Sequence, residues 1–184
     1  MPALLGLGMP SGLMPERSST SSASSISTAT ESSSGTVTGF GSVFVDGVEL
    51  EDAKAVTRVE NADGSYSLTT ARLGQRVRVA HDAGGTASTV TVDAAVIGTV
   101  ASGSVNASAL SFTVAGQSVK ANTDSGTGPV TVYGGGYTAF ADIAAGDLVE
   151  VHGSAVYDST AKVYVVQATR IEKQSAISAV RASG

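Results

Sequence analysis

Short stretches of alternating hydrophobic and polar residues, separated by Gly, Asn and Asp, fill the chain after residue 34. The alternation is clear at residues 76–79, 89–92 and 148–151. A period of two predicts strands with one buried and one wet face, so half-buried antiparallel strands are expected. Residues 45–48 and 114–117 are candidate hairpins, and the first is the stronger because its Asp46-Gly47 pair suits a turn with positive φ.

The stretches form two copies of one unit. Gly35-Thr36-Val37 returns as Gly98-Thr99-Val100, and residues 73–79 return as residues 145–151. The offset grows from 63 to 72 residues, so the second copy carries a net insertion of nine residues, which we place in the Gly-rich loop 122–137. A repeat of this length predicts tandem domains. The expected divisions are an arm or linker at 1–34, a first domain at 35–97, a second domain at 98–173 and a tail at 174–184.

Each copy reads as three strands, a short helical turn and two further strands. The helical turns are expected near residues 67–73 and 139–145, and both lead into an x-Gly-x-x-Val-x-Val strand. This is the element order of an OB-type five-stranded Greek-key barrel. The predicted fold class is therefore all-β, with two tandem small OB-like barrels and an extended N-terminal arm. A β-sandwich of two small sheets is the alternative.

The first 34 residues differ in composition from the rest of the chain. Residues 1–15 are apolar but are interrupted by three prolines and three glycines, so no transmembrane segment is expected. Residues 18–34 are mostly Ser and Thr, which is typical of a linker. Exposed apolar side chains favour aggregation, so we expect this arm to engage a neighbouring molecule. The residues expected to do so are Leu4, Leu5, Leu7, Leu13, Met14 and Ile26.

Composition and motifs exclude several classes of function. The chain has no Cys, which excludes zinc fingers, iron–sulfur ligation and thiol catalysis. It carries 16 acidic and 11 basic residues, and this balance disfavours general binding to a phosphate backbone. Neither a Gly-x-Ser-x-Gly elbow nor a phosphate-binding glycine motif is present. We therefore expect no catalytic residues, no cofactor, no metal site and no enzymatic activity.

The two histidines and a group of carboxylates are the remaining residues that could bind a metal ion. His81 and His152 lack metal-ligand spacing and are expected to face solvent at strand ends. The carboxylates at residues 46–52 raise a calcium hypothesis, but their spacing fits no EF-hand, and Glu49 and Glu51 are expected on the wet face of a strand.

Arg76 and Arg78 project from one face of a predicted strand, where OB barrels often bind oligonucleotides. Such binding needs aromatic stacking platforms, for which the candidates are Tyr66, Phe40 and Phe44, and the two Phe residues are expected in the barrel interior. We therefore expect no nucleic-acid partner. The basic first copy and the acidic second copy instead favour pairing of a basic face with an acidic one.

Four segments together resemble the bacterial domain of unknown function 5666: residues 35–49, 73–79, 146–151 and 168–172. The most specific part is Gly-Phe-Gly-Ser-Val followed by Asp-Gly-Val, and the resemblance covers residues 35–173. It implies tandem OB-like units in an exported protein and supplies no catalytic residue set. The lipobox Cys of many relatives has no counterpart in this chain.

Two functions fit these observations. The first is a non-enzymatic, extracytoplasmic structural protein that forms a homo-oligomer or polymer, such as a surface or filament subunit, through its N-terminal arm. The alternative is a monomeric extracellular binding module for a glycan such as a cell-envelope polysaccharide, a peptide or a small ligand. That module would use the loop 122–137 with Tyr133 and Tyr137, and Arg76 and Arg78 are further candidate ligand or interface residues.

Overall fold

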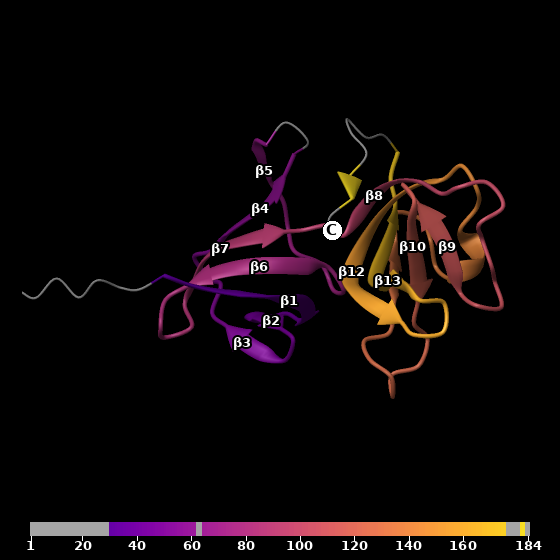
Figure 1. Cartoon of the computed structure of the whole chain (residues 1–184). Coiled ribbons are helices and arrows are strands. Elements are labelled where there is room, and N and C mark those ends of the chain that lie inside the picture. Colours follow the sequence, from indigo (N-terminus) through magenta and orange to yellow (C-terminus); the bar gives the residue numbers. More distant parts are fainter. Residues whose placement is uncertain (1–29, 62–63, 176–180, 183–184) are drawn as a thin grey trace, which may run out of the picture.

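A computed structural model of the protein describes residues 30–61, 64–175 and 181–182. These residues form two curled β-sheets that lie side by side (Figure 1). The first sheet contains β1 (Glu31–Gly39), β2 (Val43–Val45), β3 (Val48–Leu50), β4 (Val56–Glu60), β5 (Tyr66–Leu68), β6 (Arg76–His81) and β7 (Ala87–Val92). The second contains β8 (Val96–Thr99), β9 (Ser111–Val114), β10 (Gln117–Ala121), β11 (Val132–Gly134), β12 (Leu148–Asp158), β13 (Val163–Lys173) and β14 (Arg181–Ala182), with the 3₁₀ helix η1 (Phe140–Asp142) between β11 and β12.

Both sheets have the strand order of an OB barrel. In the second, β8 pairs with β12, β12 with β13, β13 in parallel with β10, and β10 with β9. A bridge between Val100 and Val114 brings β9 back to the end of β8. The first barrel repeats this order, with a parallel bridge between Glu51 and Thr86 linking the end of β3 to β7. The prediction of an all-β chain with two tandem barrels is confirmed.

The repeat found in the sequence is a repeat of strand register. Gly35 lies opposite Val77 in the first barrel, and its counterpart Gly98 lies opposite Val149 in the second. Both predicted two-residue hairpins are present. Asp46-Gly47 and Ala115-Gly116 each place two residues at positive φ, with values of 50° and 83° in the first and 49° and 79° in the second. This backbone matches the right-handed twist of paired strands.

The insertion in the second copy is distributed over several connections, so its placement in the loop 122–137 was incomplete. The loop 122–131 does separate β10 from β11, where only residues 51–55 separate β3 from β4. The connection 100–110 between β8 and β9 is also longer than the residues 40–42 between β1 and β2. The β12–β13 hairpin is longer than its counterpart in the first copy, the β6–β7 hairpin. The β4–β5 hairpin is an addition to the first copy.

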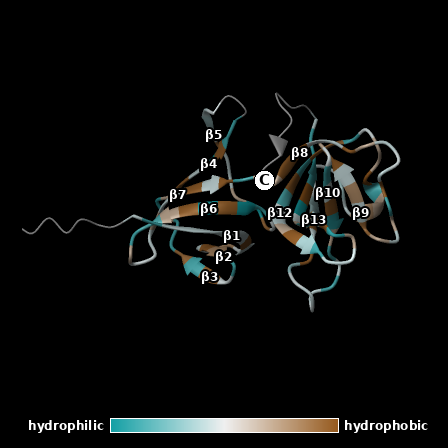
Figure 2. Cartoon of the chain, in the orientation of Figure 1, coloured by the Kyte–Doolittle hydropathy of each residue, from teal (hydrophilic) through white to brown (hydrophobic). Residues whose placement is uncertain are grey.

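Each barrel encloses its own hydrophobic core, and Figure 2 shows hydrophobic residues along the strands of both. The first core consists mainly of valines, whereas Phe112 and Phe140 pack in the second with ring centroids 6.1 Å apart. The prediction of Phe40 and Phe44 in the interior was wrong, since Phe40 is 56% exposed and Phe44 is only half-buried. A register shift between β1 and β2 places Val37 inside in their stead.

One of the two expected helical turns exists. The helix η1 lies within the predicted range 139–145, and its first residue, Phe140, is buried in the second core. No helix forms at residues 67–73. There the chain completes the β4–β5 hairpin, and the amide of Thr69 donates to the carbonyl of Thr57. Strand pairing therefore uses the backbone groups that a helical turn would need.

The strand β1 begins at Glu31, so residues 31–34 belong to the first barrel rather than to the Ser/Thr-rich linker. They pair with the end of β6, and Ser33 Oγ lies 2.9 Å from His81 Nε2. This end of the first barrel is the one farther from the second barrel (Figure 1). The arm residues Leu4, Leu5, Leu7, Leu13, Met14 and Ile26 lie outside the described residues. Within the described part of the chain, no helix has the length and apolar character needed to cross a membrane.

Candidate functional site

The two barrels meet along a seam between β13 and the loop that precedes β6. Thr169 Oγ1 donates to the carbonyl of Gly74 at 2.6 Å, and the Arg170 guanidinium donates to the carbonyl of Leu73 at 2.9 Å. Gly74 has φ of +80°, and a Cβ there would lie 2.5 Å from the carbonyl oxygen of Thr169. The backbones of the two barrels therefore approach each other at a point that accepts only glycine.

A buried group of charges lies at this seam. Glu172 Oε1 accepts from Arg170 at 2.6 Å and from Arg72 of the first barrel at 2.9 Å. The side chains of Glu172 and Arg170 are buried, whereas that of Arg72 is 61% exposed. Burial alone would raise the pKa of Glu172, but the hydrogen bonds and charges of Arg170 and then Arg72 outweigh it and lower that pKa.

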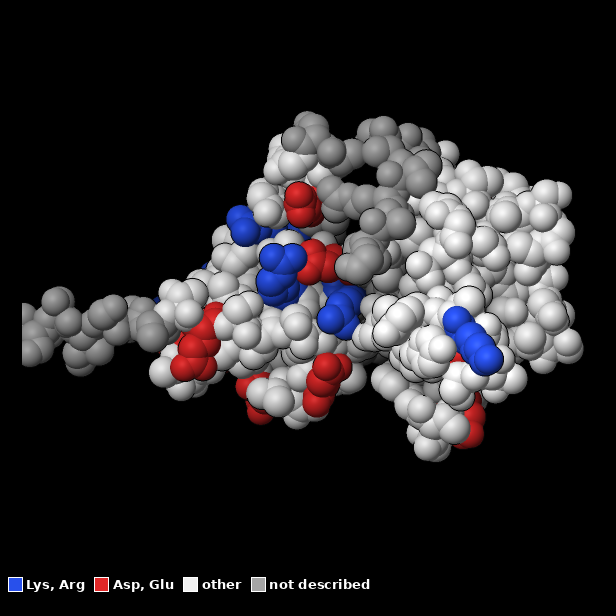
Figure 3. Space-filling model, in the orientation of Figure 1, with Lys and Arg blue, Asp and Glu red and all other residues white. Residues whose placement is uncertain are grey.

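Beside the seam is a cleft of about 510 Å³ lined by residues of both barrels. Arg76 and Arg78 lie on its first-barrel side, and in Figure 3 basic and acidic groups gather on this face of the first barrel while the second is mostly uncharged. Arg76 donates to Ser154 Oγ at 2.8 Å across the cleft. Arg78 donates to Asp93 at 2.9 Å, and this contact raises the pKa of the Arg78 guanidinium. The two predicted interface arginines thus already make contacts within this chain.

Both histidines are buried, so the expectation that they face solvent was wrong. His152 is fully buried, and its Nδ1 lies 3.0 Å from the carbonyl oxygen of Asp93. His81 is covered where β1 extends to Ser33. For His152 the cause is tertiary, because β12 lies between β8 and β13 and the strand connection at Asp93 covers its outer face.

His152 is part of a cluster with Glu150 and Glu172. In the β12–β13 register Glu150 lies opposite Glu172 and His152 lies opposite Arg170, so these four side chains share one face of the hairpin. Potential ligand atoms of Glu150, His152 and Glu172 all lie within 4.8 Å of one another. Sequence reasoning missed this cluster. The available signal was the period-two spacing in Glu150-Val151-His152 and Arg170-Ile171-Glu172, which becomes informative only when the two strands are paired.

Tyr133 and Tyr137 do not project as ligand contacts from a flexible loop. Tyr137 is 5% exposed and donates its hydroxyl to Asp147 Oδ2 at 2.6 Å. Burial raises the pKa of Tyr133, and its buried hydroxyl has no hydrogen-bond partner among the residues that the structure describes. Burial, followed by the hydrogen bond to Asp147, also raises the pKa of Tyr137. The Tyr137 ring belongs to the second core, and the partly buried Tyr133 ring packs against it.

Asp147 links three parts of the second barrel and gives a pH-dependent prediction. Its hydrogen bonds with Lys173 and then Tyr137 lower its pKa to about 2. An unfolded Asp titrates near about 3.9, so the ionised form stabilises the fold above that pH. This contribution is lost as the pH falls from about 4 towards 2. We expect Asp147→Asn to be less stable at pH 7 and to lose less stability between pH 4 and pH 2, as measured by urea unfolding.

The variant Tyr137→Phe is the partner measurement, because it keeps the ring and the Lys173 contact while removing one hydrogen bond to Asp147. Because the pKa of Asp147 is then lowered less in the folded state, we expect a smaller acid-dependent loss of stability, which ends at a higher pH than in the wild type. An unchanged acid response in Asp147→Asn would contradict this role of Asp147.

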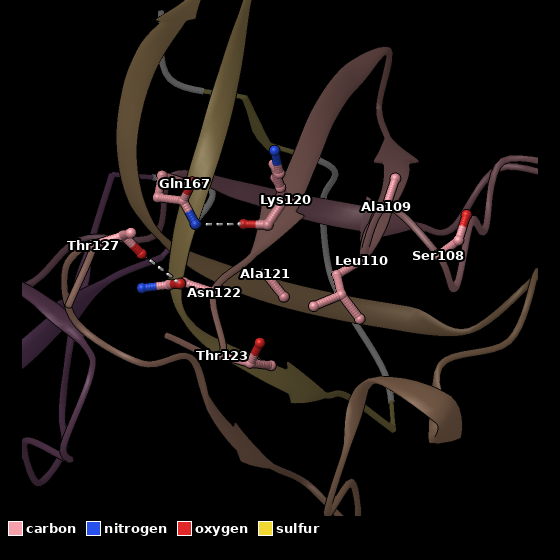
Figure 4. Close-up of a pocket in the computed structure, with 9 residues that line it drawn as sticks. All are labelled: Ser108, Ala109, Leu110, Lys120, Ala121, Asn122, Thr123, Thr127 and Gln167. Carbon is pink, nitrogen blue, oxygen red and sulfur yellow. Dashed lines mark hydrogen bonds between the residues drawn. The ribbon is translucent and has the colours of Figure 1, made fainter. Parts of the chain in front are cut away.

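A second pocket, of about 490 Å³, lies where β10 leads into the loop 122–131 (Figure 4). Its lining is mostly polar or small. Gln167 donates to the carbonyl of Lys120 at 3.1 Å, and Thr127 donates to Asn122 Oδ1 at 3.1 Å. The Asn122 amide also holds the loop by donating to the carbonyls of Asp124, Gly128 and Pro129. These polar groups thus bond mainly to one another.

Exposed hydrophobic side chains concentrate on two hairpins. On β4 and β5, Leu68 is 81% exposed, and Val56 and Tyr66 are about half exposed. Arg58 lies 4.0 Å from the centre of the Tyr66 ring. On the extended part of the β12–β13 hairpin, Tyr157 and Tyr164 form an edge-to-face pair with centroids 5.3 Å apart. Among the described residues β5 is also the last strand of its sheet, so in this part of the chain it combines an unpaired edge with apolar side chains.

Comparison with known proteins gives no further assignment: no family model, no curated protein and no solved structure matches this chain.

Proposed function

We propose that this protein is a structural subunit that assembles with copies of itself outside the cytoplasm. The observation that carries the proposal is the edge strand β5, which presents Leu68 and Tyr66 at the end of a sheet. Natural β-proteins cover or charge such edges, because open apolar edges pair with other chains. An exposed edge of this kind fits a surface that is covered in an assembly. The extracytoplasmic placement rests on the family resemblance of residues 35–173.

The N-terminal arm of a neighbouring copy is the proposed occupant of this edge. The chain has 29 residues before the described part, including the apolar residues near its start. These residues lead into β1 at the end of the first barrel farther from the second (Figure 1). An extended segment can add a strand to the open edge of another molecule.

The seam suits such a subunit. The close backbone contact at Gly74 and the Arg72–Glu172 ion pair join the two barrels, so we expect them to move together as one rigid unit. Barrels connected only by a flexible linker would move independently. A rigid two-barrel unit is what a repeating assembly requires, since the angle between successive copies must be constant.

Light scattering after size-exclusion chromatography tests the proposal. We expect the full chain to form species heavier than one 18.2 kDa chain, and deletion of residues 1–29 to leave a monomer. Leu68→Lys places a charge on the edge strand and should also reduce assembly. Retention of the heavy species after the deletion would refute the arm-mediated assembly.

A matched pair of arm variants tests whether assembly depends on the apolar side chains of the arm or only on the length of the arm. Replacing Leu4, Leu5, Leu7 and Leu13 with Ser keeps the length of the arm and should abolish assembly. Replacing serines within residues 18–28 with Gly changes the linker alone and should preserve it. Fractionation of producing cells, with detection of the protein in the envelope or medium, tests the proposed location.

A further inference from the structure

We infer that Glu150, His152 and Glu172 bind a divalent transition-metal ion, with Zn²⁺ as the best-matched ion. This inference is independent of the proposed assembly. It begins with the fully buried imidazole of His152, which lies beside two carboxylates in the interior of the molecule.

The tautomer of His152 directs an electron pair at the carboxylates. Its Nδ1 lies 3.0 Å from the Asp93 carbonyl, and a carbonyl oxygen accepts hydrogen bonds only, so Nδ1 carries the proton. In the neutral ring, Nε2 then presents a lone pair. That nitrogen lies 3.1 Å from Glu150 Oε1, which also carries lone pairs. Two such atoms repel each other unless a proton or a cation lies between them.

The direction of the contact favours a cation over a proton. A protonated Nε2 would donate along the ring plane, yet Nε2 is buried without a hydrogen-bond partner in the described part of the chain, despite its closeness to Glu150. Two ligands of one zinc ion, each about 2.1 Å from the metal, are separated by about 3.0–3.4 Å for angles from square to tetrahedral. The observed separation of 3.1 Å between Nε2 and Oε1 falls in this range.

The surrounding groups hold each ligand in the way that metal sites require. The Asp93 carbonyl fixes the ring of His152, and Gln174 donates to Glu150 Oε2 at 2.8 Å, which leaves Oε1 for an ion. Arg72 and Arg170 both donate to Oε1 of Glu172, which fixes the orientation of this carboxylate beside His152. Outer contacts of this type orient metal ligands and set their affinity.

The chemistry of the ligands selects the ion. One imidazole nitrogen with two carboxylate oxygens suits zinc better than calcium or magnesium, which prefer oxygen ligands alone. The positive charges of Arg72 and Arg170 are shared with Glu172, while Glu150 supplies a further negative charge. Three protein ligands leave a fourth position for water, and the 17% exposure of the Glu150 side chain provides access from solvent.

Titration of the EDTA-treated full chain with ZnCl₂ tests the inference by calorimetry and by thermal unfolding. Because an ion bound only by the folded state stabilises it, we expect Tm to rise by about 5–10 °C at a hundredfold excess over Kd. Glu150→Gln keeps a side chain of similar size and should weaken zinc binding about tenfold or more. X-ray absorption of the loaded protein should show one imidazole nitrogen among its nitrogen and oxygen ligands.

The exposed carboxylate variant Glu49→Gln is the matched control and should bind zinc as the wild type does. If Glu150→Gln and Glu49→Gln bind zinc equally well, or if absorption shows no imidazole ligand, binding is elsewhere and the inference fails. Absence of both a thermal shift and binding heat in the wild type would overturn it as well. If His152→Gln folds, its zinc affinity gives a second test and should also be reduced. If it does not fold, Glu150→Gln alone tests the inference.

Discussion

Replacing Arg170 with Met is expected to destabilise the protein by about 3–5 kcal/mol, because it leaves the buried carboxylate of Glu172 without its closer partner. The remaining partner, Arg72, is mostly exposed, and its pairing with Glu172 is weakened by water. Arg170 also closes the seam through its bond to the Leu73 carbonyl. Urea unfolding at pH 7 measures the loss.

Two controls identify the cause of the Arg170→Met loss. Arg78→Met removes an ion pair in which the arginine is 58% exposed, and it should cost about 1 kcal/mol or less. The double variant Arg170→Met, Glu172→Met should recover part of the loss, since no uncompensated charge then remains buried. A double variant less stable than Arg170→Met alone would show that packing, and not the unpaired charge, governs the effect.

Gly74→Ala is expected to open the seam between the barrels. A left-handed backbone costs an alanine about 1–2 kcal/mol, and the new methyl group meets the Thr169 carbonyl at 2.5 Å, which adds about 1–3 kcal/mol. The barrels can relieve the clash by moving apart. We expect small-angle X-ray scattering to show an increased maximum dimension and unfolding to lose its single transition.

The equivalent glycine of the second copy provides the control. Gly146 has φ of +88°, and its amide donates to the carbonyl of a core valine, as the amide of Gly74 does. A Cβ added at Gly146, however, would have no atom within 4 Å in the described structure. Gly146→Ala should therefore show the backbone cost alone, with unchanged dimensions. Equal losses in the two variants, with equal scattering curves, would mean that the Gly74 contact does not hold the barrels together.

Local pattern was sufficient for the strands and turns. The alternation at residues 76–79 and 148–151 marks strands whose valines point into the cores, and Asp46-Gly47 identifies a two-residue hairpin because that turn needs positive φ. The repeat also predicted the order of the five barrel strands in each copy, although a β-hairpin takes the place of the helical turn expected in the first. These features depend on neighbours in the chain, and they are therefore visible in sequence.

Predictions failed where a residue's surroundings come from another part of the chain. Phe40 is exposed because a register shift follows Val37, and His152 is buried because β12 lies against the first barrel's end at Asp93. The burial of Tyr137 has the same cause, since Tyr137 bonds to Asp147 ten residues away and packs in the core. Neither alternation nor composition records such contacts.

The candidate site shows this division most clearly. Glu150, His152 and Glu172 are ordinary strand residues in the sequence, and only the pairing of β12 with β13 brings them to one face. Sequence by itself determined two copies of a five-stranded barrel, because hydrophobic period and turn chemistry act over a few residues. Tertiary structure decided how the barrels join and which polar groups are buried between them, because burial and charge pairing depend on segments brought together by folding.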